Sequence, residues 1–298
     1  MDKSYLEYPK RGYGQDHEFY DWRMAKDRPK LTWSGGAKVA ICFIIPLEFF
    51  PLNPSGTPFK HPGAMVTPYP DLRHFTVRDY GNRVGVYRIL EALNGTAVKA
   101  TFAVNGEIAR RYPPLIHSIT SAGHEIAAHG LSTDHIHHEG LSAETEAQYI
   151  KDTCACFDEQ PSGWMSPGRG QSSHTLDILA ENNFDYCLDW EMDSVPVSTR
   201  GGLTLIPNNY ELSDFTLLHT RKQTEDSWLK QMKNSIDFSL EEYERFGGQI
   251  LGLTLTPYVI GQPFRIWALR ELLNYINETN GAHVFTAGDI QTQFTGQL

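Results

Sequence analysis

The chain has 298 residues, of which 40% are hydrophobic and 21% charged, an ordinary composition for a globular protein. Its formal net charge of −10 leaves no basic surplus for nucleic-acid phosphates or anionic membranes, so we expect neither as a partner. The N-terminal residues contain no apolar segment typical of a signal peptide, and no run is long enough for a transmembrane helix. We therefore expect a cytoplasmic protein.

The first part of the chain is irregular up to one strongly apolar segment. Residues 1–35 are polar and aromatic without a clear period, which indicates an arm on the surface of the domain. Residues 37–45 are almost continuously apolar, as in a parallel strand buried on both faces. Residues 49–76 are rich in proline and predict a long loop, which in compact domains is usually functional.

The rest of the chain alternates predicted strands and helices. Further strands are expected at residues 98–104, 124–129, 162–166, 184–189, 203–207, 214–219, 249–256 and 283–286. Helices are expected at residues 81–93, 106–122, 143–158, 173–182, 224–246 and 262–277. Ser142 is a suitable N-cap for the third of these helices. The alternation indicates parallel βαβ units, and the lack of a Gly-rich dinucleotide loop favours a barrel over a doubly wound sheet.

Three polar residues stand where predicted strands end. His129 follows the segment 124–128 and precedes a glycine, Arg169 follows the segment 163–168, and Glu48 follows the first strand. Because side chains at the carboxyl ends of barrel strands converge on one site, these residues predict a shared pocket.

Four segments give the chain a family resemblance. They are residues 79–88, 122–130, 163–169 and 259–266. Together they resemble the polysaccharide deacetylase (NodB-homology) superfamily, in particular its PuuE allantoinase-like and cyclic imide hydrolase-like branch. The resemblance implies a distorted (β/α)7-type barrel as a single domain over residues 36–298, preceded by the arm 1–35, and a homo-oligomer. It also implies hydrolysis of a carbon–nitrogen bond other than a peptide bond.

The metal-binding positions of this superfamily differ in the present chain. Metal-dependent members carry an Asp-Asp pair after the first strand, two histidines four residues apart, and a histidine after the last strand. Here the corresponding residues are Glu48 alone, Thr133 in place of the second histidine, and Thr256 in place of the last. We therefore expect no cofactor and no usual metal triad. A divalent metal such as zinc remains the alternative, including at the histidine-rich loop 130–140.

Hydrolysis of an amide or imide requires an activated water, a stabilised oxyanion and a protonated leaving nitrogen. We assign catalytic roles to His129, Glu48 and Asp193. The expected substrate-binding residues are Arg169, Trp164, Asp189, Thr256 and Arg265. The predicted function is a hydrolase for a small amide, cyclic imide or ureide. The alternatives are a non-catalytic ligand-binding member of the superfamily and a metal-dependent carbohydrate deacetylase.

Overall fold

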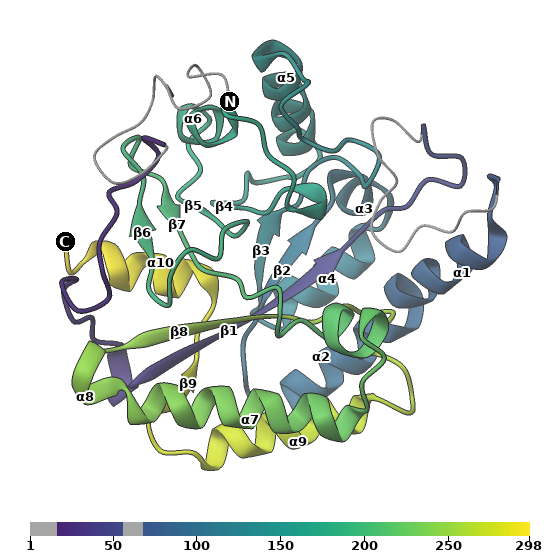
Figure 1. Cartoon of the computed structure of the whole chain (residues 1–298). Helices are drawn as coiled ribbons and strands as arrows, with labels where there is room; N and C mark the ends of the chain where they lie inside the picture. The colour runs from purple at the N-terminus through teal and green to yellow at the C-terminus, as the bar shows by residue number, and fades with distance from the viewer. Residues whose placement is uncertain (1–16, 56–67) are drawn as a thin grey trace, which may run out of the picture.

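The computed structural model describes residues 17–55 and 68–298, which form one α/β domain around a curled sheet (Figure 1). The strand order is β6-β7-β5-β4-β3-β2-β1-β8, with β9 also pairing with β1, and every pair except β6–β7 is parallel. A parallel bridge between Asn209 and Leu253 brings the segment after β7 against β8, so the sheet curls toward closure. The predicted distorted barrel is therefore confirmed.

The strands are β1 Val39–Leu47, β2 Thr101–Val104, β3 Glu125–Ala128, β4 Gly163–Trp164, β5 Tyr186–Cys187, β6 Val197–Ser198, β7 Thr204–Leu205, β8 Gln249–Thr254 and β9 Ala282–Val284. The helices are α1 Leu72–Tyr80, α2 Val86–Asn94, α3 Gly106–Arg111, α4 Pro113–Ser121, α5 Ala143–Cys154, α6 Thr175–Glu181, α7 Glu225–Glu241, α8 Tyr243–Phe246, α9 Ile266–Glu278 and α10 Ala287–Thr295. Two short 3-10 turns are η2 Ser34–Gly36 and η4 Pro167–Arg169, and two π-helices are η3 Gly81–Gly85 and η5 Phe215–Thr220.

Some predicted elements are wrong in kind or extent. The segment 214–219 is not a strand but the π-helix η5, because a short apolar run fits a buried helix as well as a buried strand. Residues 106–122 form two helices, α3 and α4, because Pro113 lacks an N–H group and therefore starts a new helix at its first position.

Two helices were missed. Helix α1 occupies part of the predicted loop 49–76 and starts where the Asp71 side chain accepts a hydrogen bond from His74 N. Helix α10 follows β9 and starts with a capping box formed by Thr286 and Asp289. The predicted N-cap of α5 is confirmed, since the Ser142 side chain accepts a hydrogen bond from Thr145 N.

Strand β1 is buried on both faces and separates two apolar clusters. Its odd-numbered residues, from Val39 to Leu47, pack toward α2, α7 and α9, which cover the outside of the sheet (Figure 1). Its even-numbered residues Ala40, Cys42 and Ile44 pack in a second cluster that includes α10. The N–H groups that begin α10 bind side chains at the first residues of β2 and β3. Helix α10 therefore covers the amino-terminal end of the barrel, and the carboxyl ends of the strands remain for a site.

The described part of the predicted arm packs on the barrel. The rings of His17, Phe19 and Tyr20 contact the Trp190 ring, and Leu31 and Trp33 are buried. Residues 1–16 of the predicted arm lie outside the described residues. Within residues 17–55 and 68–298, no helix is both long enough and apolar enough to span a membrane.

Candidate active site

The register of three parallel strands brings three polar residues together. Leu47 of β1 pairs with Val104 of β2, and Val104 pairs with Ala128 of β3. The residues that follow these partners are Glu48, Asn105 and His129. They therefore stand side by side at the carboxyl edge of the sheet, as expected for Glu48 and His129.

Asn105 connects the strand ends that carry the other two residues. Its Oδ1 accepts a hydrogen bond from Phe49 N at 2.7 Å, and its Nδ2 donates to the backbone oxygen of His129. The side chain is fully buried, so both amide groups must find partners within the protein. Sequence reasoning missed Asn105, although an asparagine directly after a buried strand is the same type of signal that identified His129.

The imidazole of His129 has one occupied and one unoccupied nitrogen. Nδ1 lies 2.8 Å from the backbone oxygen of Met165, which can only accept, so Nδ1 carries the proton in the neutral ring. Nε2 then has a free lone pair, and it is buried without a hydrogen-bond partner among the described residues. The nearest acidic group is Glu48, whose Oε1 lies 3.7 Å from Nε2. An unpaired basic nitrogen beside a carboxylate is suited to proton transfer.

Arg169 lies at the same edge, at the end of the turn η4. Its Nη1 donates to Glu191 Oε1 at 3.0 Å and to the backbone oxygen of Asn208 at 2.8 Å. Burial lowers the pKa of Arg169, while Glu191 opposes that effect. Its backbone φ of 55° is uncommon for a residue other than glycine, and such conformations concentrate at functional sites.

These residues surround a cavity of about 150 Å³. Its polar lining includes Glu48, His129, Arg169 and Thr256. The remaining wall is mostly apolar and contains Pro46, Phe50, Met165, Gly168, Tyr210, Ser213, Phe215, Thr254 and Tyr258. The sequence did not identify the aromatic side chains of this wall as a group, because they come from segments that are far apart along the chain. A cavity with this mixed lining suits a small molecule that carries both apolar and polar groups.

The other predicted site residues do not line this cavity. Trp164 is fully buried and donates to Ser166 Oγ at 2.8 Å. Asp189 accepts hydrogen bonds from Ser166 N and Gln171 Nε2, and so supports both ends of the turn η4, which contains Arg169.

Asp193 and Arg265 also have partners of their own outside the cavity. Asp193 forms an ion pair with Arg28 in a separate cleft beneath the arm. Arg265 donates to Glu225 Oε1 at 2.9 Å. The geometry therefore does not bring Asp193 or Arg265 to the reacting groups.

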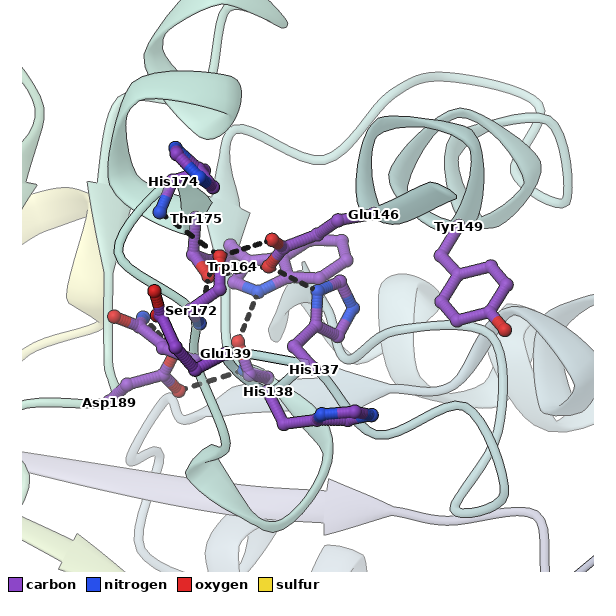
Figure 2. Close-up of polar contacts among 12 residues, drawn as sticks. His137, His138, Glu139, Glu146, Tyr149, Trp164, Ser172, His174, Thr175 and Asp189 are labelled. Carbon is purple, nitrogen blue, oxygen red and sulfur yellow. Dashed lines mark hydrogen bonds and ion pairs between the residues drawn. The ribbon is translucent and has the colours of Figure 1, made fainter. Parts of the chain in front are cut away.

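A buried polar cluster joins the loops that carry His129 and Arg169 (Figure 2). The carboxylate of Glu146 accepts hydrogen bonds from His137 Nδ1 at 2.8 Å and from the hydroxyls of Ser172 and Thr175. Burial raises the pKa of Glu146, but these three hydrogen bonds together lower it below its ordinary value. The cluster holds the loop after His129 against the loop after Arg169.

The side chains at this site do not fit the catalytic metal that metal-dependent members of the resembled superfamily bind. A catalytic zinc needs three protein ligands and an open position. Within residues 17–55 and 68–298, no group of three or more His, Cys, Asp or Glu side chains could hold a metal ion. Thr133, which stands in place of the second histidine, donates from Oγ1 to the backbone oxygen of Phe49 at 3.0 Å, so this hydroxyl has a structural partner. In the histidine-rich loop, His135 and His138 bind Ser132 Oγ and Gly140 N.

Residues 76–187 match the family model described as polysaccharide deacetylase. This match covers less than half of the chain. A Schizosaccharomyces pombe protein with a provisional polysaccharide deacetylase name is 22% identical over 87% of this chain and 90% of its own length.

Solved structures have the same fold as this chain. PuuE allantoinase superposes with a TM-score of 0.79 at 22% identity, over 93% of this chain and 98% of its own. A probable polysaccharide deacetylase from Pseudomonas aeruginosa PAO1 superposes with a TM-score of 0.77 at 22% identity, over 97% and 99%. The predicted family resemblance is thereby confirmed, and the structural similarity establishes the fold alone.

Proposed function

We propose that this protein hydrolyses a carbon–nitrogen bond, other than a peptide bond, in a small amide, cyclic imide or ureide. The observation that carries the proposal is the unpaired Nε2 of His129, which lies 3.7 Å from Glu48 Oε1 beside the cavity. That distance is too long for a direct hydrogen bond, and it leaves room for one water to contact both groups.

The chemistry follows from the hydrogen bonding of His129, whose Nδ1 is occupied and whose Nε2 is not. Nε2 of neutral His129 accepts a proton from water as the water oxygen attacks the substrate carbonyl, with Glu48 orienting the water and stabilising the imidazolium. Arg169 lines the same cavity and supplies positive charge for the oxygen that becomes negative in the tetrahedral intermediate. The imidazolium returns the proton to the leaving nitrogen as the carbon–nitrogen bond breaks.

This mechanism needs no metal. Among the described residues, no three His, Cys, Asp or Glu side chains are grouped so that they could hold one, which supports that part of the proposal. The same deficit argues against a metal-dependent carbohydrate deacetylase. It also favours one alternative, a non-catalytic member that binds a small ligand in the same cavity. A compound that raises the melting temperature of the protein but is never consumed would identify this second function.

The test is turnover of a panel by the purified protein with and without a chelator. The panel contains allantoin, hydantoin, succinimide and acetylated chito-oligosaccharides. We expect the protein to open the ring of a cyclic compound at a rate that the chelator does not change. His129→Gln and Glu48→Gln should each lower this rate by about 10²–10⁴-fold. Asp193→Asn is the matched control, because this acid pairs with Arg28 outside the cavity. Full activity in a folded His129→Gln variant would refute the assignment.

A further inference from the structure

A buried carboxylate outside the predicted site holds two walls of the cavity together. Asp214 is fully buried and immediately precedes the π-helix η5. Both of its oxygens accept hydrogen bonds from Thr256 N, at 2.9 and 2.8 Å, and Oδ2 also accepts from Ile260 N at 3.1 Å. The neighbours of Asp214 in the chain, Ser213 and Phe215, line the cavity on one side, and Thr256 lines it on the other.

The segment held by Asp214 has no free space on its other side. A Cβ on Gly85 would lie 2.1 Å from the backbone oxygen of Pro257, and one on Gly261 would lie 2.3 Å from the same atom. A Cβ on Gly81 would lie 2.9 Å from Tyr258 N. The helical backbone of residues 81–85 therefore packs directly against residues 257–261, and glycine is required for this approach.

Tyr258 transmits this arrangement to the substrate cavity. Its ring lies 6.4 Å from the rings of both Phe50 and Phe215, in edge-on contacts, and all three residues line the cavity. A shift of the segment 256–260 would move Thr256 and Tyr258 relative to Glu48, which lies on a different strand. The shape of the aromatic wall thus depends on the hydrogen bonds to Asp214.

We propose that Asp214 is a positioning residue that holds the segment 256–260 in the geometry required for catalysis. The inference rests on the proposed function, since it assigns Asp214 a role in the same reaction. Asp214 does not line the cavity, so it acts through the backbone of Thr256 and Ile260. In its ionised form the carboxylate suits this role better than an amide side chain, because it then presents only acceptors to the N–H donors around it.

The experiment compares Asp214→Asn with a matched control, Glu125→Gln. Glu125 is a partly buried carboxylate, and it accepts hydrogen bonds from Thr101 Oγ1, Tyr186 OH and Gly288 N at the opposite end of the barrel. We would measure hydrogen exchange of the Thr256 and Ile260 amides at pH 8, together with kcat and KM for the cyclic substrate.

In Asp214→Asn we expect these two amides to exchange at least about tenfold faster. The asparagine side chain has one acceptor oxygen where the carboxylate has two, so the hydrogen bonds of Thr256 N and Ile260 N are weakened. We expect kcat to fall by about 10²-fold with a smaller change in KM, because misplaced groups impair the reaction more than binding. Glu125→Gln should leave both amides and kcat unchanged. Unchanged exchange in Asp214→Asn, or faster exchange with normal kcat, would overturn the proposal.

Two results separate this inference from the proposed function. If the wild-type protein turns over no cyclic compound, the proposed function fails, and the exchange rates alone decide whether Asp214 holds the segment. If Asp214→Asn does not fold, hydrogen exchange in the wild-type protein tests the role of Asp214 instead. The Thr256 and Ile260 amides should then exchange only through global unfolding, and rapid exchange at either would refute the role of Asp214.

Discussion

Replacing Asp214 by asparagine should change how the stability of the protein depends on pH. Burial raises the pKa of Asp214 from an ordinary value of 3.8 to about 7, although backbone hydrogen bonds from Thr256 and Ile260 oppose this effect. In the unfolded chain the same group titrates near its ordinary value. The folded state therefore binds a proton between these two pH values that the unfolded state has lost.

The sign and size of the effect follow from this difference. The stability contributed by the neutral acid is fully present below pH 3.8, and it is lost as the pH rises through about 7. A difference of about three pH units corresponds to about 4 kcal/mol, at ~1.4 kcal/mol for each unit. This is a large share of the ~5–15 kcal/mol by which most proteins are stable. Asparagine cannot titrate, so the free energy of unfolding of the variant should not show this loss as the pH rises.

The assay is urea unfolding of both proteins at several pH values between 4.5 and 8.5. Other titrating groups are common to the two proteins and should cancel when the free energies of unfolding are subtracted. We expect the wild-type value to fall relative to Asp214→Asn by about 3–4 kcal/mol across this range. Parallel pH profiles would show that the carboxyl is already ionised at pH 4.5, and the reasoning about its burial would be wrong.

Three further predictions follow from particular contacts. Gly85→Ala should lower the free energy of unfolding by about 1–3 kcal/mol in urea titrations, because the new Cβ would meet the Pro257 oxygen at 2.1 Å; an unchanged midpoint would contradict this packing. Glu146→Ala should cost about 3–5 kcal/mol in the same assay, since it leaves His137 and two hydroxyls buried without their acceptor, and a loss below 1 kcal/mol would argue against the cluster. Dialysis against a chelator should leave both the melting temperature and the turnover of a cyclic substrate unchanged, and a loss restored by zinc would refute metal independence.

Much of the barrel can be predicted from the sequence because its strands are short, apolar and separated by helices. The apolar run before Glu48 predicts a strand buried on both faces, and β1 is such a strand. Short apolar runs without a period are ambiguous, which explains why residues 214–219 were assigned to a strand and form a π-helix instead.

The candidate site divides in the same way. Glu48, His129 and Arg169 could be named in advance, because each directly follows or ends a segment that delivers it to the carboxyl edge of the sheet. No local pattern could show that Asp189 and Asp193 lie outside the cavity. Only the folded chain shows that Asp189 binds Ser166 and Gln171 and that Asp193 pairs with Arg28. The aromatic residues of the cavity have no common motif and meet only through packing.

The sequence by itself determined the order of the elements, the two-sided burial of β1 and the polar residues at the strand ends, because these depend on neighbours within a few positions of the chain. The tertiary structure decided which polar groups meet. Asp214 finds the amides of Thr256 and Ile260 on a distant segment, and His129 has its free nitrogen toward Glu48 because Met165 occupies the other. Such partnerships depend on the register of neighbouring strands and on the packing of remote loops, which no local pattern of residues encodes.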